Sequence, residues 1–236
     1  MRHIAALIAL VLFLGACGDK DASVASVTPS LIARAEAADS PAGNFVQVQY
    51  QEGREYTVLA EPVKTVSGDK IEVTEFFSYG CIHCFHFETA VHAWEKNTMP
   101  AGVEFVQTPA VFNKAWEHYA RAFYAAKALG VWDKAHPVVF DTIHVKRKRL
   151  GTVDEMAELF ATFGVKEDDF KKAYSSFGVT SQVQAGDARA RAAGLRGTPE
   201  LMVDGRYKIT TGSAGGHEQM FQVANFLIDK IKRERK

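Results

Sequence analysis

Two cysteines separated by two residues stand where a strand pattern changes into a helix pattern. The apolar run of residues 70–77 comes shortly before Cys81, and an amphipathic pattern begins at Cys84. Cysteines at this spacing can close into a disulfide, and a sulfur at the start of a helix lies at its positive end. The spacing therefore predicts a thiol redox centre at a strand–helix junction, within an α/β fold.

The two cysteines are expected on different sides of the predicted helix. Phe87, Val91 and Trp94 follow Cys84 at steps of three, four and three residues, which is the period of a buried helix face. We therefore expect Cys84 in the core and Cys81 at the exposed tip. In that arrangement Cys81 meets a partner and Cys84 resolves the mixed disulfide.

A carboxyl group falls on the apolar face of the preceding strand. A period of two places Glu75 on one face with Ile71, Val73 and Phe77. Burial raises the pKa of a carboxyl group. Glu75 is therefore either a satisfied structural acid or a group that relays the proton of Cys84 during resolution.

Length and charge allow one domain with an insertion and argue against nucleic-acid binding. The chain has 236 residues, with 28 basic and 28 acidic side chains, and so has no overall basic field. Two local basic runs, at residues 146–149 and 230–236, are interpreted as solvated helix faces or ends. We expect no nucleic-acid partner.

The N-terminus is typical of an exported lipoprotein. An apolar stretch of 11 residues, Ile4 to Leu14, is too short to span a bilayer and resembles an export signal. It runs into Leu14-Gly15-Ala16-Cys17, which resembles a bacterial lipobox. We expect a signal peptide at residues 1–16, a lipidated Cys17 and a flexible tether to residue 44. The alternatives are an ordinary signal peptide with an incidental Cys17 thiol, or a retained anchor.

Residues 45–236 are predicted to form one α/β domain, with an all-helical insertion at about residues 113–180. Asp204-Gly205 predicts a hairpin between the last two strands. The strand patterns cover residues 45–59 (an edge strand), 70–77, 103–106, 201–203 and 207–209. The helix patterns cover residues 81–94, 115–129, 132–144, 153–163, 167–177, 181–193 and 217–232.

A proline stands directly before the strand predicted at residues 201–203, in the sequence Gly197-Thr198-Pro199. It either simply lacks a donor to the strand ladder or forms a cis peptide bond, which a fold retains for a purpose. In redox folds such a loop lies against the disulfide and presents backbone groups to an extended substrate.

Together these segments resemble the DsbA family of periplasmic thiol:disulfide oxidoreductases. The resemblance is carried by residues 75–84, 195–199 and 203–207, and it extends over residues 45–232. It implies a thioredoxin fold with an inserted all-helical subdomain. The lipobox suggests a member of the family that is tethered to a bacterial membrane.

The resemblance implies roles for the residues of the dithiol motif. Cys81 matches the attacking cysteine, and Cys84 matches its buried partner in a redox-active disulfide. His83 matches the histidine of the intervening dipeptide. Ile82 departs from the family pattern, which usually has proline there, and we expect it to alter the rigidity of the helix start and the redox potential.

Outside the motif, the resemblance marks one acid and one loop. Glu75 matches the buried acid beneath the active site, and is a catalytic candidate. Pro199 matches the cis-proline and Thr198 the residue before it, and both are expected to bind substrate. Glu200 departs from the pattern, since a small or apolar residue usually follows the cis-proline; it either biases substrate choice or points outward.

The expected activity depends on a stabilised thiolate at Cys81. Stabilising the thiolate favours the reduced form and makes the disulfide a stronger oxidant. A helix N-terminus contributes typically about 0.3–1 kcal/mol, and one pKa unit corresponds to about 1.4 kcal/mol, so a large shift needs further donors. DsbA proteins are a standard example of a strongly lowered cysteine pKa. Our own prediction is that the imidazole of His83 contributes to it.

The resemblance implies an enzyme that donates its disulfide to reduced or unfolded exported polypeptides and is re-oxidised by a DsbB-type, quinone-linked membrane oxidase. No cofactor and no metal are implied, and we expect a periplasmic monomer. A reductase or isomerase is the alternative with the same chemistry. A metal-binding lipoprotein using Cys81, His83, Cys84 and His86 is a further alternative, although a closed zinc site needs four converging ligands. A plain binding module would leave the two cysteines unexplained.

Overall fold

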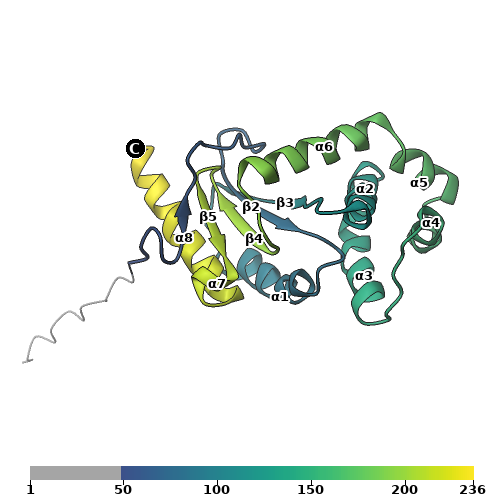
Figure 1. Cartoon of the computed structure of the whole chain (residues 1–236), viewed down its shortest axis with the longest axis horizontal. Coiled ribbons are helices and arrows are strands. Elements are labelled where there is room, and N and C mark those ends of the chain that lie inside the picture. The colour runs from purple at the N-terminus through teal and green to yellow at the C-terminus, as the bar shows by residue number, and fades with distance from the viewer. Residues whose placement is uncertain (1–48) are drawn as a thin grey trace, which may run out of the picture. The chain divides into compact units, whose positions relative to one another are not determined.

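The computed structural model describes residues 49–236. The predicted signal peptide, Cys17, the tether and residues 45–48 of the predicted edge strand lie outside these residues. The strands are β1 (Thr57–Val58), β2 (Ile71–Phe77), β3 (Val103–Pro109), β4 (Glu200–Val203) and β5 (Tyr207–Thr210). The helices are α1 (Ile82–Asn97), α2 (Lys114–Ala128), α3 (Trp132–His144), α4 (Val153–Ala161), α5 (Glu167–Tyr174), α6 (Phe177–Ala192), α7 (Thr211–Ala214) and α8 (His217–Glu234) (Figure 1).

One five-stranded sheet in the order β1-β5-β4-β2-β3 forms the centre of the domain. β2 and β3 are parallel, whereas the other pairs are antiparallel. All seven residues of β2 are buried, because both faces of the sheet are covered. α1 and α8 share one apolar cluster with the sheet, and the C-terminal end of α6 packs on the other face against Phe76 and Met202. β2 therefore runs through the middle of the core and ends shortly before the start of α1.

The helices α2 to α6 separate β3 from β4 along the chain, and α2 to α5 build a second apolar cluster with Phe77 and Tyr79 at the end of β2. Figure 1 shows them gathered beside one edge of the sheet. This arrangement agrees with the predicted α/β fold with an all-helical insertion. No helix within residues 49–236 has the length and apolar composition to cross a bilayer.

The predicted hairpin is present, with both turn residues in the left-handed region. Asp204 has φ 53° and Gly205 has φ 65°, the backbone that a two-residue hairpin turn requires. A Cβ atom at Gly205 would lie 1.9 Å from the carbonyl oxygen of Val63. Only glycine therefore fits this turn.

Two sequence predictions are corrected by the structure. Within the described residues, the edge strand predicted at 45–59 is reduced to Thr57–Val58. The chain turns at Gly53, which has φ 81°, and the N–H of Gly53 donates to the carbonyl of Tyr56 instead of to a neighbouring strand. The helix predicted at residues 167–177 ends at Tyr174, and the next one begins at Phe177 rather than 181. The side chain of Ser176 caps that new helix by accepting from the N–H of Val179 at 3.2 Å.

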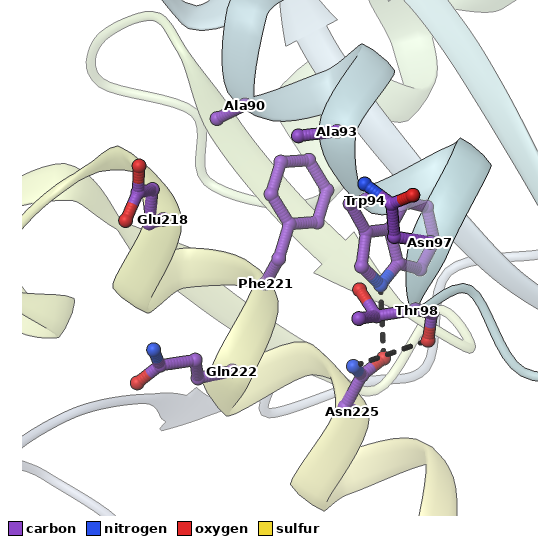
Figure 2. A pocket seen from close by; sticks show the side chains of 9 residues that line it. All are labelled: Ala90, Ala93, Trp94, Asn97, Thr98, Glu218, Phe221, Gln222 and Asn225. Carbon is purple, nitrogen blue, oxygen red and sulfur yellow. Dashed lines mark hydrogen bonds between the residues drawn. The ribbon is translucent and has the colours of Figure 1, made fainter.

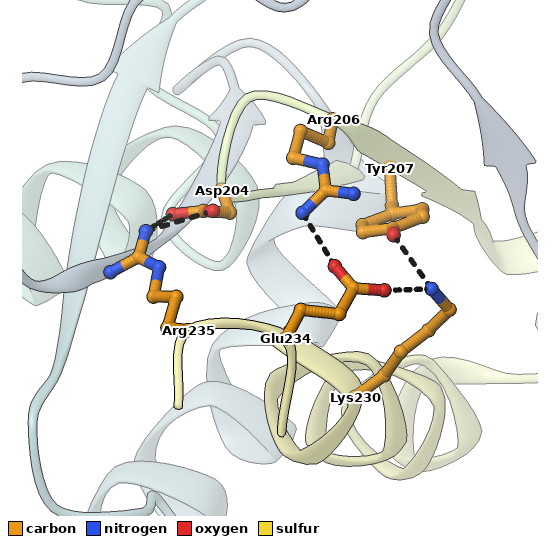
Figure 3. A network of polar contacts seen from close by, with 6 residues as sticks. All are labelled: Asp204, Arg206, Tyr207, Lys230, Glu234 and Arg235. Atoms are coloured by element: carbon orange, nitrogen blue, oxygen red, sulfur yellow. Dashed lines mark hydrogen bonds and ion pairs between the residues drawn. The ribbon is translucent and has the colours of Figure 1, made fainter. Parts of the chain in front are cut away.

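Polar contacts fasten the C-terminal end of α8 to the hairpin (Figure 3). Arg235 donates to both carboxylate oxygens of Asp204 at 2.7 and 2.9 Å. Glu234 accepts from Arg206 at 2.9 Å and also pairs with Lys230. Apart from Asp204, whose side chain is mostly covered, these side chains are partly exposed, so the contacts orient the helix end and add little to stability. The apolar face of α8 supplies most of its packing.

A buried ion pair connects α6 to β2. The carboxylate of Glu72 is fully buried and pairs with the guanidinium of Arg189 from α6. It also accepts from the N–H of Val66 at 2.6 Å and from the hydroxyl of Thr74 at 2.6 Å. Although burial raises the pKa of Glu72, these hydrogen bonds and the Arg189 charge bring it below its usual range.

Candidate active site

The dithiol lies where the end of β2 turns into α1. The N–H of Cys81 donates to the carbonyl of Ser78 at 3.0 Å, which closes the turn. Cys81 is the N-cap of α1, and its sulfur accepts a hydrogen bond from the N–H of Cys84 at 3.3 Å. Both cysteines are present as free thiols. The sulfur thus occupies the place where serine or aspartate usually caps a helix.

The turn before Cys81 is packed against the helical insertion. A Cβ atom at Gly80 would lie 3.0 Å from the indole nitrogen of Trp116 and 3.0 Å from the ring of Tyr119. The imidazole of His144 donates from Nε2 to the carbonyl of Tyr79 at 2.8 Å. The helices α2 and α3 therefore fix the backbone that leads into the dithiol.

The structure confirms a buried Cys84 but corrects the expected exposure of Cys81. Cys84 has no exposed surface, whereas Cys81 retains 8%. Cys81 was expected at an exposed tip, yet its thiol lies beneath the loop before β4 and donates to the carbonyl of Thr198 at 3.4 Å. A partner therefore reaches only a small part of Cys81.

The pKa values of the two thiols are shifted in opposite directions. The pKa of Cys81 is lowered to about 5. The main cause is the hydrogen-bonding Cys84 thiol. The side chain of Thr198 and the backbone N–H groups of Cys84 and His83 also lower the pKa, against the opposing effect of burial. The pKa of Cys84 is raised well above its usual value, mainly by burial and then by its hydrogen bond to Cys81. At neutral pH the site therefore holds one thiolate and one thiol.

The loop that faces the thiols has the predicted cis peptide bond between Thr198 and Pro199. Together with His83 and His217 it borders a pocket of about 300 Å³ beside the dithiol. His217, the first residue of α8, was missed by the sequence analysis. Only the tertiary fold brings it opposite His83, because the two residues lie far apart in the chain.

The two departures from the family pattern have different surroundings. Ile82 is 42% exposed at the first turn of α1. Glu200 is 5% exposed, so of the two alternatives the one in which it points outward is wrong. Its carboxylate turns back to the loop and accepts from the N–H of Gly197 at 3.1 Å.

The histidines of α1 lie on the outside of the helix. His83, His86 and His92 are all exposed. His83 contacts the thiolate site through its backbone N–H and borders the pocket with its side chain. Among residues 49–236, no three metal-ligating side chains converge on one point, and Cys84 is turned into the core.

Glu75 lies beneath the dithiol in a polar connection that the sequence did not indicate. It is fully buried and accepts from the side-chain amide of Gln107 at 2.8 Å. The same amide lies 3.1 Å from Glu88 of α1, whose carboxylate is 3.3 Å from His136 of α3. Burial, followed by the charge of Glu88, raises the pKa of Glu75 well above its usual value. Burial and the neighbouring carboxylate therefore both favour the protonated form of Glu75.

A second hollow lies farther along α1 and does not contain the dithiol. This groove of about 270 Å³ lies between α1 and α8. Figure 2 shows the side chains that line it, among them the stacked rings of Trp94 and Phe221. The indole N–H of Trp94 donates to the side chain of Asn225 at 2.9 Å. Neither cysteine lines this groove, so we place the candidate active site at the dithiol and the Thr198–Pro199 loop.

Comparison with known proteins finds the same fold and the same class of enzyme. Residues 72–227 match the DSBA-like thioredoxin domain. The thiol:disulfide interchange protein DsbA of Azotobacter vinelandii is 42% identical over 178 residues, which cover 75% of this chain and 83% of that protein. DsbA of Pseudomonas aeruginosa is 38% identical over 181 residues, covering 77% of this chain and 85% of that protein.

Solved structures agree with these relatives. The crystal structure of Pseudomonas aeruginosa DsbA matches with a TM-score of 0.74 at 37% identity, covering 79% of this chain and 96% of that chain. The oxidoreductase DsbA of Xylella fastidiosa matches with a TM-score of 0.73 at 31% identity, covering 78% and 98%. This chain belongs to the DsbA family of thiol:disulfide oxidoreductases.

Proposed function

We propose that this protein introduces disulfide bonds into reduced, unfolded polypeptides in the periplasm, using the Cys81–Cys84 pair. The observation that carries the proposal is the lowered pKa of Cys81, about 5, beside a buried Cys84 whose pKa is raised. A thiol with a low pKa is a good leaving group, and its stable thiolate favours the reduced enzyme. Electrons therefore flow from the substrate to the protein.

The reaction runs in two exchanges. In the oxidised enzyme a substrate thiolate attacks the sulfur of Cys81, the Cys81–Cys84 bond breaks, and Cys84 leaves and takes up a proton. A second substrate thiolate then attacks the substrate sulfur of the mixed disulfide and expels Cys81 as a thiolate. The substrate loses two electrons and gains a disulfide, and the enzyme becomes a dithiol.

The surrounding residues are assigned supporting roles. Thr198 and Pro199 border the pocket beside the dithiol and are placed to bind the substrate backbone. His83 favours the Cys81 thiolate. Glu75 lies beneath the dithiol, and its raised pKa suits an acid that passes protons to and from the sulfur of Cys84.

Two assays test the direction of the reaction. The oxidised protein should form a disulfide in a reduced dithiol peptide faster than the reduced protein reduces insulin with glutathione as donor. Equilibration with glutathione buffers gives the redox potential. A strongly reducing potential together with fast insulin reduction would favour the reductase or isomerase alternative instead.

The proposed cycle needs an oxidant. We infer that a DsbB-type, quinone-linked membrane oxidase restores the Cys81–Cys84 disulfide, as the family relationship implies. Membranes from a bacterium that contains such an oxidase should re-oxidise the reduced protein. Membranes from a strain that lacks it should not.

We also propose that a lipid on Cys17 holds the protein to a bacterial membrane. The support is the sequence Leu14-Gly15-Ala16-Cys17 after an apolar run. Radioactive palmitate should label the wild-type protein but not a Cys17→Ser variant, and the variant should leave the membrane fraction. Absence of label from the wild type would favour an ordinary signal peptide. Gel filtration of the chain lacking residues 1–17 tests the expected monomer.

A further inference from the structure

We propose that Glu200 is a positioning residue for the exchange reaction. It holds the backbone of residues 196–198 so that the carbonyl of Thr198 stays against the sulfur of Cys81. This inference rests on the proposed function, since it concerns how the loop beside the dithiol is prepared for substrate.

The Glu200 carboxylate accepts hydrogen bonds from loop N–H groups that would otherwise need a backbone carbonyl as acceptor. Its Oε1 atom accepts from the N–H of Gly197 at 3.1 Å and from the N–H of Arg196 at 3.4 Å. Within residues 49–236 these two N–H groups have no other hydrogen-bond partner. The sheet cannot supply one, because β4 begins only at Glu200.

A lysine on the neighbouring strand completes the contact. The ammonium of Lys208 donates to the carbonyl of Gly194 at 2.7 Å and lies 3.9 Å from Oε2 of Glu200. Two side chains from β4 and β5 therefore hold the loop at residues 194, 196 and 197. Burying a carboxylate is costly unless hydrogen bonds and a countercharge compensate. Here Oε1 has both hydrogen bonds to the loop, whereas Oε2 has no hydrogen-bond partner and only the Lys208 charge beside it. Burial therefore still raises the pKa of Glu200.

The held segment is the one that touches the active site. Thr198 comes directly after the two residues bound by Glu200, and its carbonyl accepts from the Cys81 thiol at 3.4 Å. The N–H groups of Arg196 and Gly197 fix the peptide planes that lead into that carbonyl. A small or apolar residue at position 200 would leave both N–H groups without an acceptor. The loop would then sample other conformations, and the Thr198 contact with Cys81 would weaken.

Paired variants separate this role from a general effect of charge. Glu200→Met removes the acceptor and keeps the volume, whereas Glu200→Gln removes the charge and keeps an acceptor oxygen. In Glu200→Met we expect the KM for a reduced dithiol peptide to rise about 3- to 10-fold, the effect of one lost hydrogen bond. We also expect the pKa of Cys81 to rise above about 5, because a displaced loop also moves the Thr198 side chain, whose hydrogen bond helps to lower that pKa.

Rescue by the conservative variant is the decisive readout. Glu200→Gln should restore both the KM and the thiolate titration, since its amide oxygen accepts from the same N–H groups. Glu104→Gln serves as the matched control on β3, because Glu104 pairs on the surface with Lys70 at 2.8 Å. It should leave both quantities at their wild-type values.

The outcomes distinguish this inference from the proposed function. If the wild type does not oxidise the peptide, the proposed function is wrong, and the thiolate titration still tests Glu200. If the wild type is active and Glu200→Met matches it in KM and titration, the inference is wrong. If Glu200→Met does not fold, Lys208→Met is measured instead. A smaller rise in the KM and in the pKa of Cys81 supports the inference, and wild-type values of both overturn it.

Discussion

The backbone N–H of Cys84 donates to the sulfur of Cys81 across 3.3 Å, so the helix turn that separates the two cysteines also stabilises charge on the first one. We expect the thiolate absorbance of the reduced protein to titrate with a midpoint of about 5. Iodoacetamide should label Cys81 with the same pH profile and label Cys84 far more slowly, because Cys84 is fully buried.

Two substitutions test the part played by the second thiol. The Cys84 thiol is the largest cause of the low pKa of Cys81, so Cys84→Ala should raise that pKa. Cys84→Ser should raise it less, because a hydroxyl still donates a hydrogen bond. If Cys81 titrates in both variants as it does in the wild type, the Cys84 thiol makes no contribution and the backbone alone stabilises the thiolate. Equal labelling rates of the two cysteines in the wild type would refute the site as described.

The lowered pKa also predicts how stability depends on pH. Cys81 has a pKa of about 5 in the folded protein and about 8.5 when unfolded. Between these values the unfolded state binds more protons, so the stability of the reduced protein rises with pH. This contribution is fully present above about pH 8.5 and is lost as the pH falls through about 5.

The oxidised protein provides the control for this pH dependence, since a disulfide has no thiol to titrate. The difference in Tm between the reduced and oxidised forms should therefore move in favour of the reduced form from pH 5 to pH 8. Differential scanning calorimetry at several pH values measures it. A difference that stays constant with pH would contradict the lowered pKa.

The side chain of His83 is predicted to contribute separately from its backbone. His83→Ala keeps the N–H that helps to lower the pKa of Cys81 and removes only the imidazole. We expect the pKa of Cys81 to rise and the redox potential to fall, because the thiolate loses a nearby donor. Thiolate absorbance and glutathione equilibration measure the two changes. His86→Ala, an exposed histidine one turn along α1, is the matched control and should leave both unchanged.

The sequence predicts well the parts of the site that depend on local patterns. The steps from Cys84 to Trp94 place Cys84 in the core, and it is fully buried. Asp204-Gly205 predicts a turn with two positive φ values, and both are present. In each case the physical requirement acts between residues only a few positions apart, so it leaves a period or a motif in the chain.

Features that depend on distant segments were not predictable in this way. Cys81 is covered because Thr198, 117 residues later, lies over its sulfur. The connection from Glu75 through Gln107 to Glu88 joins β2, β3 and α1, and none of the three residues has an unusual neighbourhood in the sequence. The inward turn of Glu200 likewise depends on a loop whose N–H groups lack strand partners. Spacing cannot reveal such contacts, because side-chain direction follows from the packing.

Glu75 is predicted to act in the resolution of the mixed disulfide. Glu75→Gln keeps the volume and the contact with Gln107 but removes the titrating proton. If Glu75 relays protons, resolution should slow about 100-fold or more, the contribution typical of a general acid or base. Stopped-flow measurement of the step in which Cys84 attacks a preformed mixed disulfide on Cys81, at several pH values, tests this. Resolution as fast as in the wild type at every pH would leave Glu75 a structural acid.

A second variant changes the acidity of Glu75 without touching it. Glu88→Gln removes the negative charge that, after burial, most raises the pKa of Glu75. The pKa of Glu75 should fall, and the pH profile of resolution should move to lower pH. A slower reaction with an unshifted profile would instead indicate that Glu88 only supports the packing of α1 against His136.

The buried pair between Glu72 and Arg189 is predicted to be a main connection between the helical insertion and the sheet. Arg189→Met would leave the fully buried Glu72 carboxylate without its countercharge, which typically costs about 3–5 kcal/mol. Urea unfolding at pH 7 measures this loss. Lys70→Met breaks the exposed pair with Glu104 and should cost no more than about 1 kcal/mol.

The pH dependence of the stability of Arg189→Met shows whether the lost charge or the lost packing destabilises this variant. The pKa of Glu72 is lowered in the folded wild type, so its contribution to stability is present above the unfolded pKa of about 4.3 and is lost as the pH falls further. In Arg189→Met, protonation of Glu72 at acidic pH removes the uncompensated charge, and the gap to the wild type should narrow from pH 7 towards pH 4. A gap that stays constant over this range would show that Arg189 stabilises the fold by packing its side chain against β2 and β3, and that its charge contributes nothing.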